Sequence, residues 1–146
     1  MSDILSSRPF YTTFVTPLDA SIPSKIHSNP KFWPYFKDIV GAVDGCHIPI
    51  SPPSHRASSY RNRKGFLSQN CLFICGFDLD FKYSLCRWEG SASDVRVYEE
   101  AFAHGLIIPE GKYILGDLGY PYRGKLLVPY RGVRYHLAEW GRANVR

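Results

Sequence analysis

The sequence predicts an α/β domain whose elements follow one another in the order β-β-β-α-β. Short apolar runs rich in β-branched and aromatic residues are bounded by Gly, Pro and Asp, which is typical of strands. One later segment, 94–104, has instead the apolar spacing of an amphipathic helix. With 146 residues, of which 45% are hydrophobic and 15% aromatic, the chain is long enough to bury one core.

The first three elements are expected to form an antiparallel meander. Residues 39–50 give the first strand, which ends at the prolines that follow it. A polar connection over 51–69 leads to a second strand over 70–78. The alternating residues 81–88 give a third strand, and Asp78-Leu-Asp80 supplies the turn between the two.

A helix and a fourth strand complete the predicted order. Ser91 or Ser93 can cap a helix over 94–104, and Gly105 is suited to end it. Residues 112–116 give the fourth strand, after which a long loop rich in Gly, Pro, Tyr and Arg begins. A right-handed crossover from the third strand would lay the fourth strand beside the first and parallel to it.

The chain divides into two segments of different composition. Residues 1–37 are rich in Ser, Pro and aromatic residues and show little periodicity. We predict that they form a leader or lid, which Phe32, Trp33 and Phe36 pack onto the domain. The domain itself is assigned to residues 38–146.

Composition excludes some classes of protein. No apolar run approaches the roughly 20 residues that a membrane helix requires, so no membrane partner is expected. The first residues lack the basic and apolar regions of a secretory signal, which favours an intracellular protein that is not secreted. The net charge of +5 and the pI near 9.1 favour an anionic partner, although the excess is modest.

The cysteines do not form a recognisable metal-binding or redox motif. Cys46, Cys71, Cys75 and Cys86 lie in or beside apolar runs, and no Cys-x-x-Cys pair is present. We expect buried free thiols, and a disulfide, a redox role or a zinc site are the alternatives.

Two aspartates directly follow strand-like apolar runs. Residues 39–43 lead into Asp44, and residues 113–116 lead into Asp117. A carboxylate after a buried strand lies at the rim of the sheet, where α/β proteins bind ligands. If the two strands are neighbours, the two negative charges repel each other unless a cation lies between them. The pair therefore predicts a divalent metal site for Mg²⁺ or Mn²⁺, and Asp94, which opens the predicted helix, could support it.

Each of these residues also has a structural interpretation. Asp44 and Asp117 could be turn residues that accept hydrogen bonds from nearby backbone N–H groups. Asp94 could be an ordinary acid at a helix N-terminus. His47 is expected to be a packed or hydrogen-bonded residue rather than a metal ligand.

Six short motifs occur in a fixed order along the chain, and together they resemble a known family. They are Asp44-Gly-Cys-His-Ile, Tyr60-Arg-Asn-Arg-Lys-Gly65, Ser68-Gln-Asn-Cys71, Trp88-Glu-Gly-Ser-Ala-Ser-Asp94, Leu115-Gly-Asp-Leu-Gly-Tyr-Pro121 and Pro129-Tyr-Arg-Gly-Val-Arg-Tyr-His136. Over roughly residues 38–140, this series resembles the catalytic domain of PIF/Harbinger-type transposases, a group of DDE superfamily endonucleases.

The resemblance implies a fold, a reaction and a set of site residues. The fold would be an RNase H-like mixed sheet, incomplete at its C-terminal end. Asp44 would supply the first catalytic acid and Asp117 the second, and Asp94 would match a further acid associated with metal binding. Divalent cations, Mg²⁺ or Mn²⁺, would then support phosphodiester hydrolysis and strand transfer on DNA. Nuclear residence follows from the same resemblance.

Two basic, aromatic-flanked segments are candidate contacts for DNA. The first contains Arg61, Arg63 and Lys64, and the second contains Arg131 and Arg134. These side chains could hold phosphates, and the alternative is a solvated, charged loop. No helix-turn-helix or zinc-finger pattern is visible, so target recognition would lie elsewhere or in a separate DNA-binding partner protein.

The chain departs from the family pattern at the third acid. In the family this residue is a Glu on a later helix, and Glu139 does not occupy that motif position. We therefore expect a truncated nuclease domain with impaired activity. The alternatives are a catalytically inactive transposon-derived remnant, which binds DNA or a partner protein, and a metal-dependent hydrolase of small molecules.

Overall fold

The computed structural model describes residues 8–132, and its main elements follow the predicted order β-β-β-α-β. The elements are strands β1, β2 and β3, helix α5 and strand β4, at Ile39–Pro49, Ser68–Cys75, Phe81–Glu89, Asp94–Ala103 and Tyr113–Leu115. A two-residue strand, β5 (Leu126–Leu127), follows β4. The sequence does not predict β5, because two residues carry no measurable periodicity.

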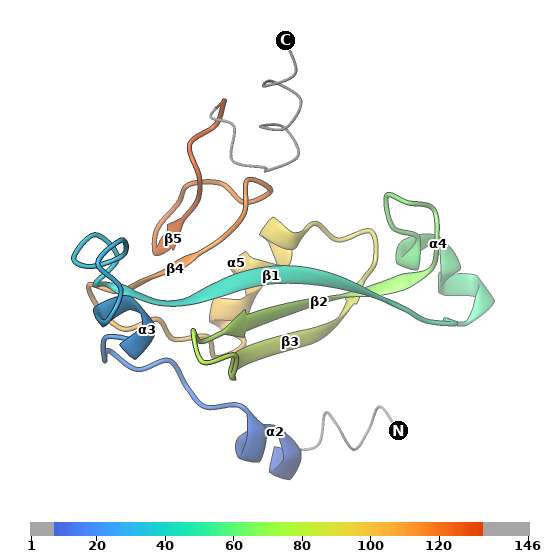
Figure 1. Ribbon diagram of the computed structural model, residues 1–146. Coiled ribbons are helices and arrows are strands. Elements are labelled where there is room, and N and C mark those ends of the chain that lie inside the picture. The colour runs from blue at the N-terminus through green and yellow to red at the C-terminus, as the bar shows by residue number, and fades with distance from the viewer. Residues whose placement is uncertain (1–7, 133–146) are drawn as a thin grey trace.

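The five strands form one mixed sheet in the order β3-β2-β1-β4-β5. β1 pairs with β2, and β2 with β3, in the antiparallel direction, whereas β1 pairs with β4, and β4 with β5, in the parallel direction. The predicted placement of the fourth strand beside the first is therefore confirmed. Figure 1 shows the meander, with α5 packed along it and β4 and β5 on the far side of β1. This α/β arrangement agrees with the RNase H-like class.

A tight turn joins β2 to β3 where the sequence predicts it. The backbone N–H of Gly76 donates a hydrogen bond to the carbonyl oxygen of Asp80 at 2.9 Å. Leu79 has a φ of 65°, the left-handed conformation that a compact turn often requires. Asp80 also forms an ion pair with Lys82 at 2.7 Å. Its role is therefore structural, as predicted.

Helix α5 begins at the predicted residue and ends one residue before the predicted end. The side chain of Ser93 caps it by accepting a hydrogen bond from the backbone N–H of Arg96. Gly105 follows the last turn with a φ of +89°, which a residue with a Cβ rarely adopts. Val97 and Tyr98 are buried against the sheet. The cap and the buried face together fix the first turn of α5, which carries Asp94.

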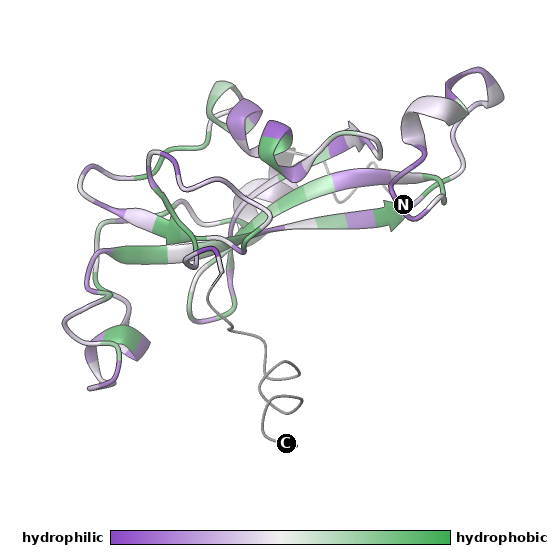
Figure 2. Cartoon of the chain, turned by 90° about the horizontal axis from the view of Figure 1, so that it is seen from above, coloured by the Kyte–Doolittle hydropathy of each residue, from purple (hydrophilic) through white to green (hydrophobic). Residues whose placement is uncertain are grey.

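The core lies between α5 and the sheet. Its buried members come from all the main elements: Val40, Val43, Leu72, Ile74, Tyr83, Val97, Tyr98, Ala101, Leu106, Ile108, Ile114, Tyr120 and Leu126. Along β1 the residues alternate between buried and exposed positions from 41 to 44. Figure 2 shows this mixture of hydrophobic and hydrophilic residues along the strands. One face of the meander is therefore covered by α5.

Within residues 8–132, four short helical segments lie outside the sheet. They are α2 (Arg8–Phe14), α3 (Ser24–His27), the 3₁₀ segment η1 (Ser54–Arg56) and α4 (Ala57–Tyr60). In Figure 1, α3 lies near the start of β1, and α4 lies at the opposite end of that strand. Among residues 8–132, no helix has the length and apolar character that would let it cross a bilayer.

The segment before β1 contacts the domain differently from the prediction. Val15 forms a parallel bridge to β3, and Leu18 packs against the core. Phe32 is 41% exposed and contacts Phe36 through its ring edge. Trp33 packs its ring against a neighbour in the same segment. The ring contacts of Phe32, Trp33 and Phe36 therefore lie within the segment itself, with Phe32 against Phe36 and Trp33 against His27.

All four cysteines are free thiols, as predicted, but only part of the burial prediction is correct. Cys71 is buried and Cys75 is half-buried, whereas Cys46 and Cys86 are exposed. Cys46 is exposed because it lies on the same face of β1 as Asp44, away from the face that α5 covers.

Candidate functional site

Asp44 and Asp117 both follow the paired segment of β1 and β4. The last paired residues are Ala42 of β1 and Leu115 of β4. Asp44 lies two residues further along β1, whereas Asp117 lies two residues further along the chain, just past the end of β4. Neighbouring strands lie about 4.8 Å apart, so we expect the two acids to be close together, and their proximity stays a prediction.

Both acids also make the local hydrogen bonds of turn residues. One carboxylate oxygen of Asp44 accepts from the backbone N–H of Gly45 at 2.9 Å. One oxygen of Asp117 accepts from the backbone N–H of Gly119 at 2.8 Å. Both residues are exposed. Because a carboxylate offers several acceptor sites, these bonds orient the side chains and leave capacity for a cation.

Asp94 is held firmly against β1 from the first turn of α5. Its Oδ1 accepts a hydrogen bond of 2.7 Å from the side-chain amide of Asn70, which also donates to the carbonyl oxygen of Ala92 at 3.0 Å. A Cβ placed on Gly45 would lie 2.3 Å from the same Oδ1. The carboxylate therefore occupies the space that the absence of a side chain at Gly45 leaves open.

Asp44 and Asp94 lie on opposite faces of β1. Side chains alternate along a strand, so Asp44 points away from the face on which Gly45 meets Asp94. Tyr120 is only 2% exposed and lies within electrostatic reach of all three carboxylates. Burial chiefly, and then the charges of Asp94, Asp44 and Asp117, raise the pKa of the Tyr120 hydroxyl. The sequence analysis did not identify Tyr120.

The carboxylate oxygens suit a hard cation that keeps several water ligands, rather than an ion that protein ligands enclose completely. Within the described part of the chain, no three His, Cys, Asp or Glu side chains gather closely enough to hold an ion. His47 is engaged elsewhere, since its Nδ1 lies 3.1 Å from the Oγ of Ser68, and its predicted structural role is confirmed. Mg²⁺ keeps several waters and usually takes one or two carboxylates plus substrate phosphates. The carboxylates of Asp44 and Asp117 fit that requirement, and Asp94 lies on the other face of β1.

The first basic segment borders a cavity beside Asp94. Arg61, Arg63 and Lys64 are exposed in the loop between α4 and β2. Arg61 is directed into its own loop, because it donates a hydrogen bond of 2.6 Å to the carbonyl oxygen of Gly65. Arg63 and Lys64 line a cavity of about 370 Å³, which Asp94 also lines. Two of the three predicted basic residues thus share a cavity with Asp94.

Asn62 organises this loop, although the sequence analysis did not select it. Its side-chain oxygen accepts hydrogen bonds from the backbone N–H groups of Lys64 and Phe66, at 3.0 Å and 3.3 Å. Its amide donates to the Oγ of Ser68 at 3.1 Å. An Asn three residues before a Gly is a recognisable turn signal, which could have identified it. The backbone that carries Arg63 is therefore held in a defined shape.

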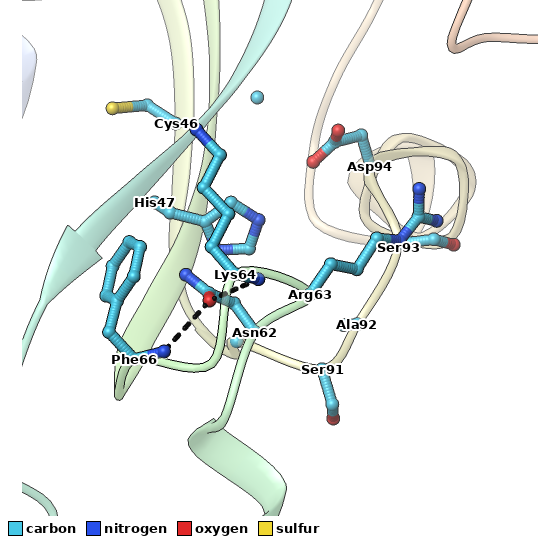
Figure 3. A pocket seen from close by; sticks show the side chains of 12 residues that line it. Cys46, His47, Asn62, Arg63, Lys64, Phe66, Ser91, Ala92, Ser93 and Asp94 are labelled. Atoms are coloured by element: carbon cyan, nitrogen blue, oxygen red, sulfur yellow. Dashed lines mark hydrogen bonds between the residues drawn. The ribbon is translucent and has the colours of Figure 1, made fainter.

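The two walls of the cavity carry opposite charges. Figure 3 shows Arg63 extending toward the first turn of α5, where Ser93 and Asp94 lie. Lys64 extends past His47 on the other side of the cavity. A phosphate could contact the basic wall, while the acidic wall would require a cation between itself and the phosphate.

The second basic segment is only partly described. Arg131 is exposed, and its neighbour Tyr130 is 86% exposed. Arg134 lies outside the described residues, and so does Glu139. Contact of this segment with DNA therefore stays a prediction.

Comparison with known proteins defines the family. Residues 43–144 match the family model described as "DDE superfamily endonuclease", and this match covers more than half of the chain. The chain belongs to this family of endonucleases, as its motifs predicted. No solved structure matches the chain.

The chain is also similar to curated proteins of three mammals, each described as "Putative nuclease HARBI1". Over 96 residues it is 33% identical to the protein of Rattus norvegicus, 32% identical to that of Mus musculus and 31% identical to that of Homo sapiens. Each match covers 62% of this chain and 27% of the relative. The chain thus matches little more than a quarter of the length of these relatives.

Proposed function

We propose that this chain carries the first two acids of a divalent-metal-dependent DNA endonuclease of the transposase type. The observation that supports the proposal best is the parallel pairing of β1 with β4, which ends two residues before Asp44 and Asp117, in a member of the DDE superfamily endonuclease family. Mg²⁺ or Mn²⁺, when bound, would activate a water molecule and neutralise charge on the phosphodiester. Strand transfer would use the same residues, with a DNA 3′-hydroxyl in place of water.

The residues of the chain have separate roles in this proposal. Asp44 and Asp117 would hold the cation, and Asp94, fixed by Asn70, would support it from the other side of β1. Arg63 and Lys64 would bind phosphates of the DNA backbone next to the acids. These contacts position the strand but carry no sequence information. A separate protein would therefore select the target, and a DNA substrate would place both proteins in the nucleus.

A nicking assay tests the catalytic proposal directly. Supercoiled plasmid incubated with the chain and Mn²⁺ is expected to relax to the nicked form, and EDTA is expected to stop the reaction. Asp117→Asn should remove the activity, because it removes a cation ligand without changing the size of the side chain. Nicking that persists in Asp117→Asn would contradict the proposal and indicate a contaminating nuclease.

A second candidate function is DNA or protein binding without catalysis. The observation that favours it is that Asp44 and Asp117 each accept a local hydrogen bond from a glycine N–H, as ordinary turn residues do. The same assay separates the two functions, because a chain that only binds DNA retards the plasmid in a gel without nicking it.

The basic wall gives an independent prediction about DNA affinity. Arg63→Ala/Lys64→Ala is expected to weaken binding to DNA of any sequence, because each side chain can neutralise one phosphate. The slope of log K against log salt should fall by about 2, roughly one for each phosphate that is no longer neutralised. Fluorescence anisotropy with a labelled duplex at several salt concentrations measures both quantities.

The matched control removes equal charge at the other end of β1. Lys31→Ala/Lys37→Ala changes two exposed lysines in the segment that precedes the strand. This variant is expected to keep the salt slope of the wild type. Equal reductions in both double variants would show that binding depends on net charge rather than on the cavity wall.

A further inference from the structure

Tyr120 is fixed in place by contacts on three sides. Its backbone N–H donates a hydrogen bond to the carbonyl oxygen of Asp117 at 3.2 Å. Its ring meets the ring of Tyr98 edge-on, with centroids 6.0 Å apart. A Cβ on Gly116 would come within 3.3 Å of the ring, so the backbone of β4 approaches it closely. The direction of the hydroxyl is therefore determined by packing.

The hydroxyl of Tyr120 is buried without a hydrogen-bond partner among the described residues. A buried polar group without a partner is unfavourable and rare in folded proteins. The charges that act on this hydroxyl are the carboxylates of Asp94, Asp44 and Asp117, with Asp94 contributing most. Burial first, and then these negative charges, raise the pKa of the hydroxyl, so toward a carboxylate it can act only as a hydrogen-bond donor.

Asp94 offers an acceptor that the described residues leave free. Asn70 donates to its Oδ1, whereas its Oδ2 receives no hydrogen bond within residues 8–132. Ligating carboxylates commonly receive further hydrogen bonds that orient them toward a cation. We propose that Tyr120 is a positioning residue, whose hydroxyl donates to the carboxylate of Asp94 and, with Asn70, fixes its orientation in the cation-bound site. This inference rests on the proposed function.

Tyr98 provides a matched control for a test by substitution. Its hydroxyl is also buried and without a partner among the described residues, and its ring contacts Tyr120. Burial alone raises the pKa of Tyr98 to about 12, without a contribution from any carboxylate. Tyr98→Phe and Tyr120→Phe therefore remove equivalent atoms from one packed pair, but only the second removes a hydroxyl within electrostatic reach of the three acids.

The experiment measures Mn²⁺ binding to the whole chain. Calorimetry is expected to show that Tyr120→Phe binds Mn²⁺ about 10- to 100-fold more weakly than the wild type, whereas Tyr98→Phe binds normally. The electron paramagnetic resonance spectrum of bound Mn²⁺ should change only in Tyr120→Phe, because the ligand geometry changes. Circular dichroism and melting temperature verify that both variants are folded.

The outcomes separate this inference from the function on which it rests. If the wild type and both variants bind Mn²⁺ equally and give the same spectrum, the inferred role of Tyr120 is wrong. The proposed metal site is then still supported. If both variants show the same reduction in affinity, the effect is one of packing and the inference is also wrong. If the wild type does not bind Mn²⁺, the proposed function fails together with the inference.

Discussion

Asp44→Asn/Asp117→Asn is expected to abolish the stabilisation of the protein by Mn²⁺. A ligand that binds only the folded state stabilises it by about 2.7 kcal/mol at a concentration of 100 times its Kd. The wild type should therefore melt at a higher temperature in Mn²⁺, and the double variant should not. The fold should survive, because an Asn oxygen can still accept the local bonds from Gly45 and Gly119 that each Asp accepts now.

Without a cation, the same double variant is expected to be as stable as the wild type or slightly more stable. The reason is that the two carboxylates repel each other across neighbouring strands. The control is Asp78→Asn, which changes an exposed aspartate 3.8 Å from Lys25 in an ion pair outside the site. This variant should keep the full response to Mn²⁺. An unchanged response in the double variant would disprove the assignment of the two acids to a metal site.

Gly45→Ala is expected to destabilise the protein by about 1–3 kcal/mol and to weaken Mn²⁺ binding. The added Cβ would lie 2.3 Å from Oδ1 and 2.5 Å from Cγ of Asp94, so the carboxylate must move. Moving the Asp94 carboxylate breaks the 2.7 Å hydrogen bond that it accepts from Asn70. Asn70 is fully buried, so its amide would be left without this partner. In a strand without such a neighbour, the same substitution would stabilise by about 0.5–1 kcal/mol, so the sign of the effect is diagnostic. Urea denaturation measures it.

A double variant tests whether the steric explanation is correct. In Gly45→Ala/Asp94→Ala the obstructing carboxylate is absent, so the added methyl group has space. The free energy of unfolding should therefore be less sensitive to Gly45→Ala in the Asp94→Ala background than in the wild type. Strictly additive effects would show that the alanine acts on another part of the structure.

The main elements could be predicted because each carries its own local signal. β2 and β3 have apolar or alternating residues and a polar turn, and α5 has a cap at Ser93 and a stop at Gly105. The position of β4 beside β1 followed from the handedness of crossovers, which is a rule about topology rather than about residues. The attachment of the N-terminal segment could not be predicted in this way. An exposed aromatic residue such as Phe32 looks the same in sequence as a buried one.

The site was predictable only in part for a related reason. Asp44 and Asp117 stand out because each follows a strand-like run, and each lies two residues past the last pair of β1 and β4. Asn70 lies within a strand, and its importance depends on Asp94, which is distant in sequence. Tyr120 is buried by its contact with Tyr98 on α5. Roles that arise from contacts between distant segments leave no local pattern in the sequence.

The parallel pairing of β1 with β4 places the candidate site where two strands that are distant in the sequence meet. A short turn joins β2 to β3, and the connection from β1 to β2 covers residues 50–67, whereas β4 returns to β1 only after the intervening strands and α5. Ordering a longer closed segment costs more conformational entropy. A cation that bridges Asp44 and Asp117 would oppose this cost directly, because it would tie the last long-range strand to the first. Binding energy at the site would thus also contribute to holding the two halves of the sheet together.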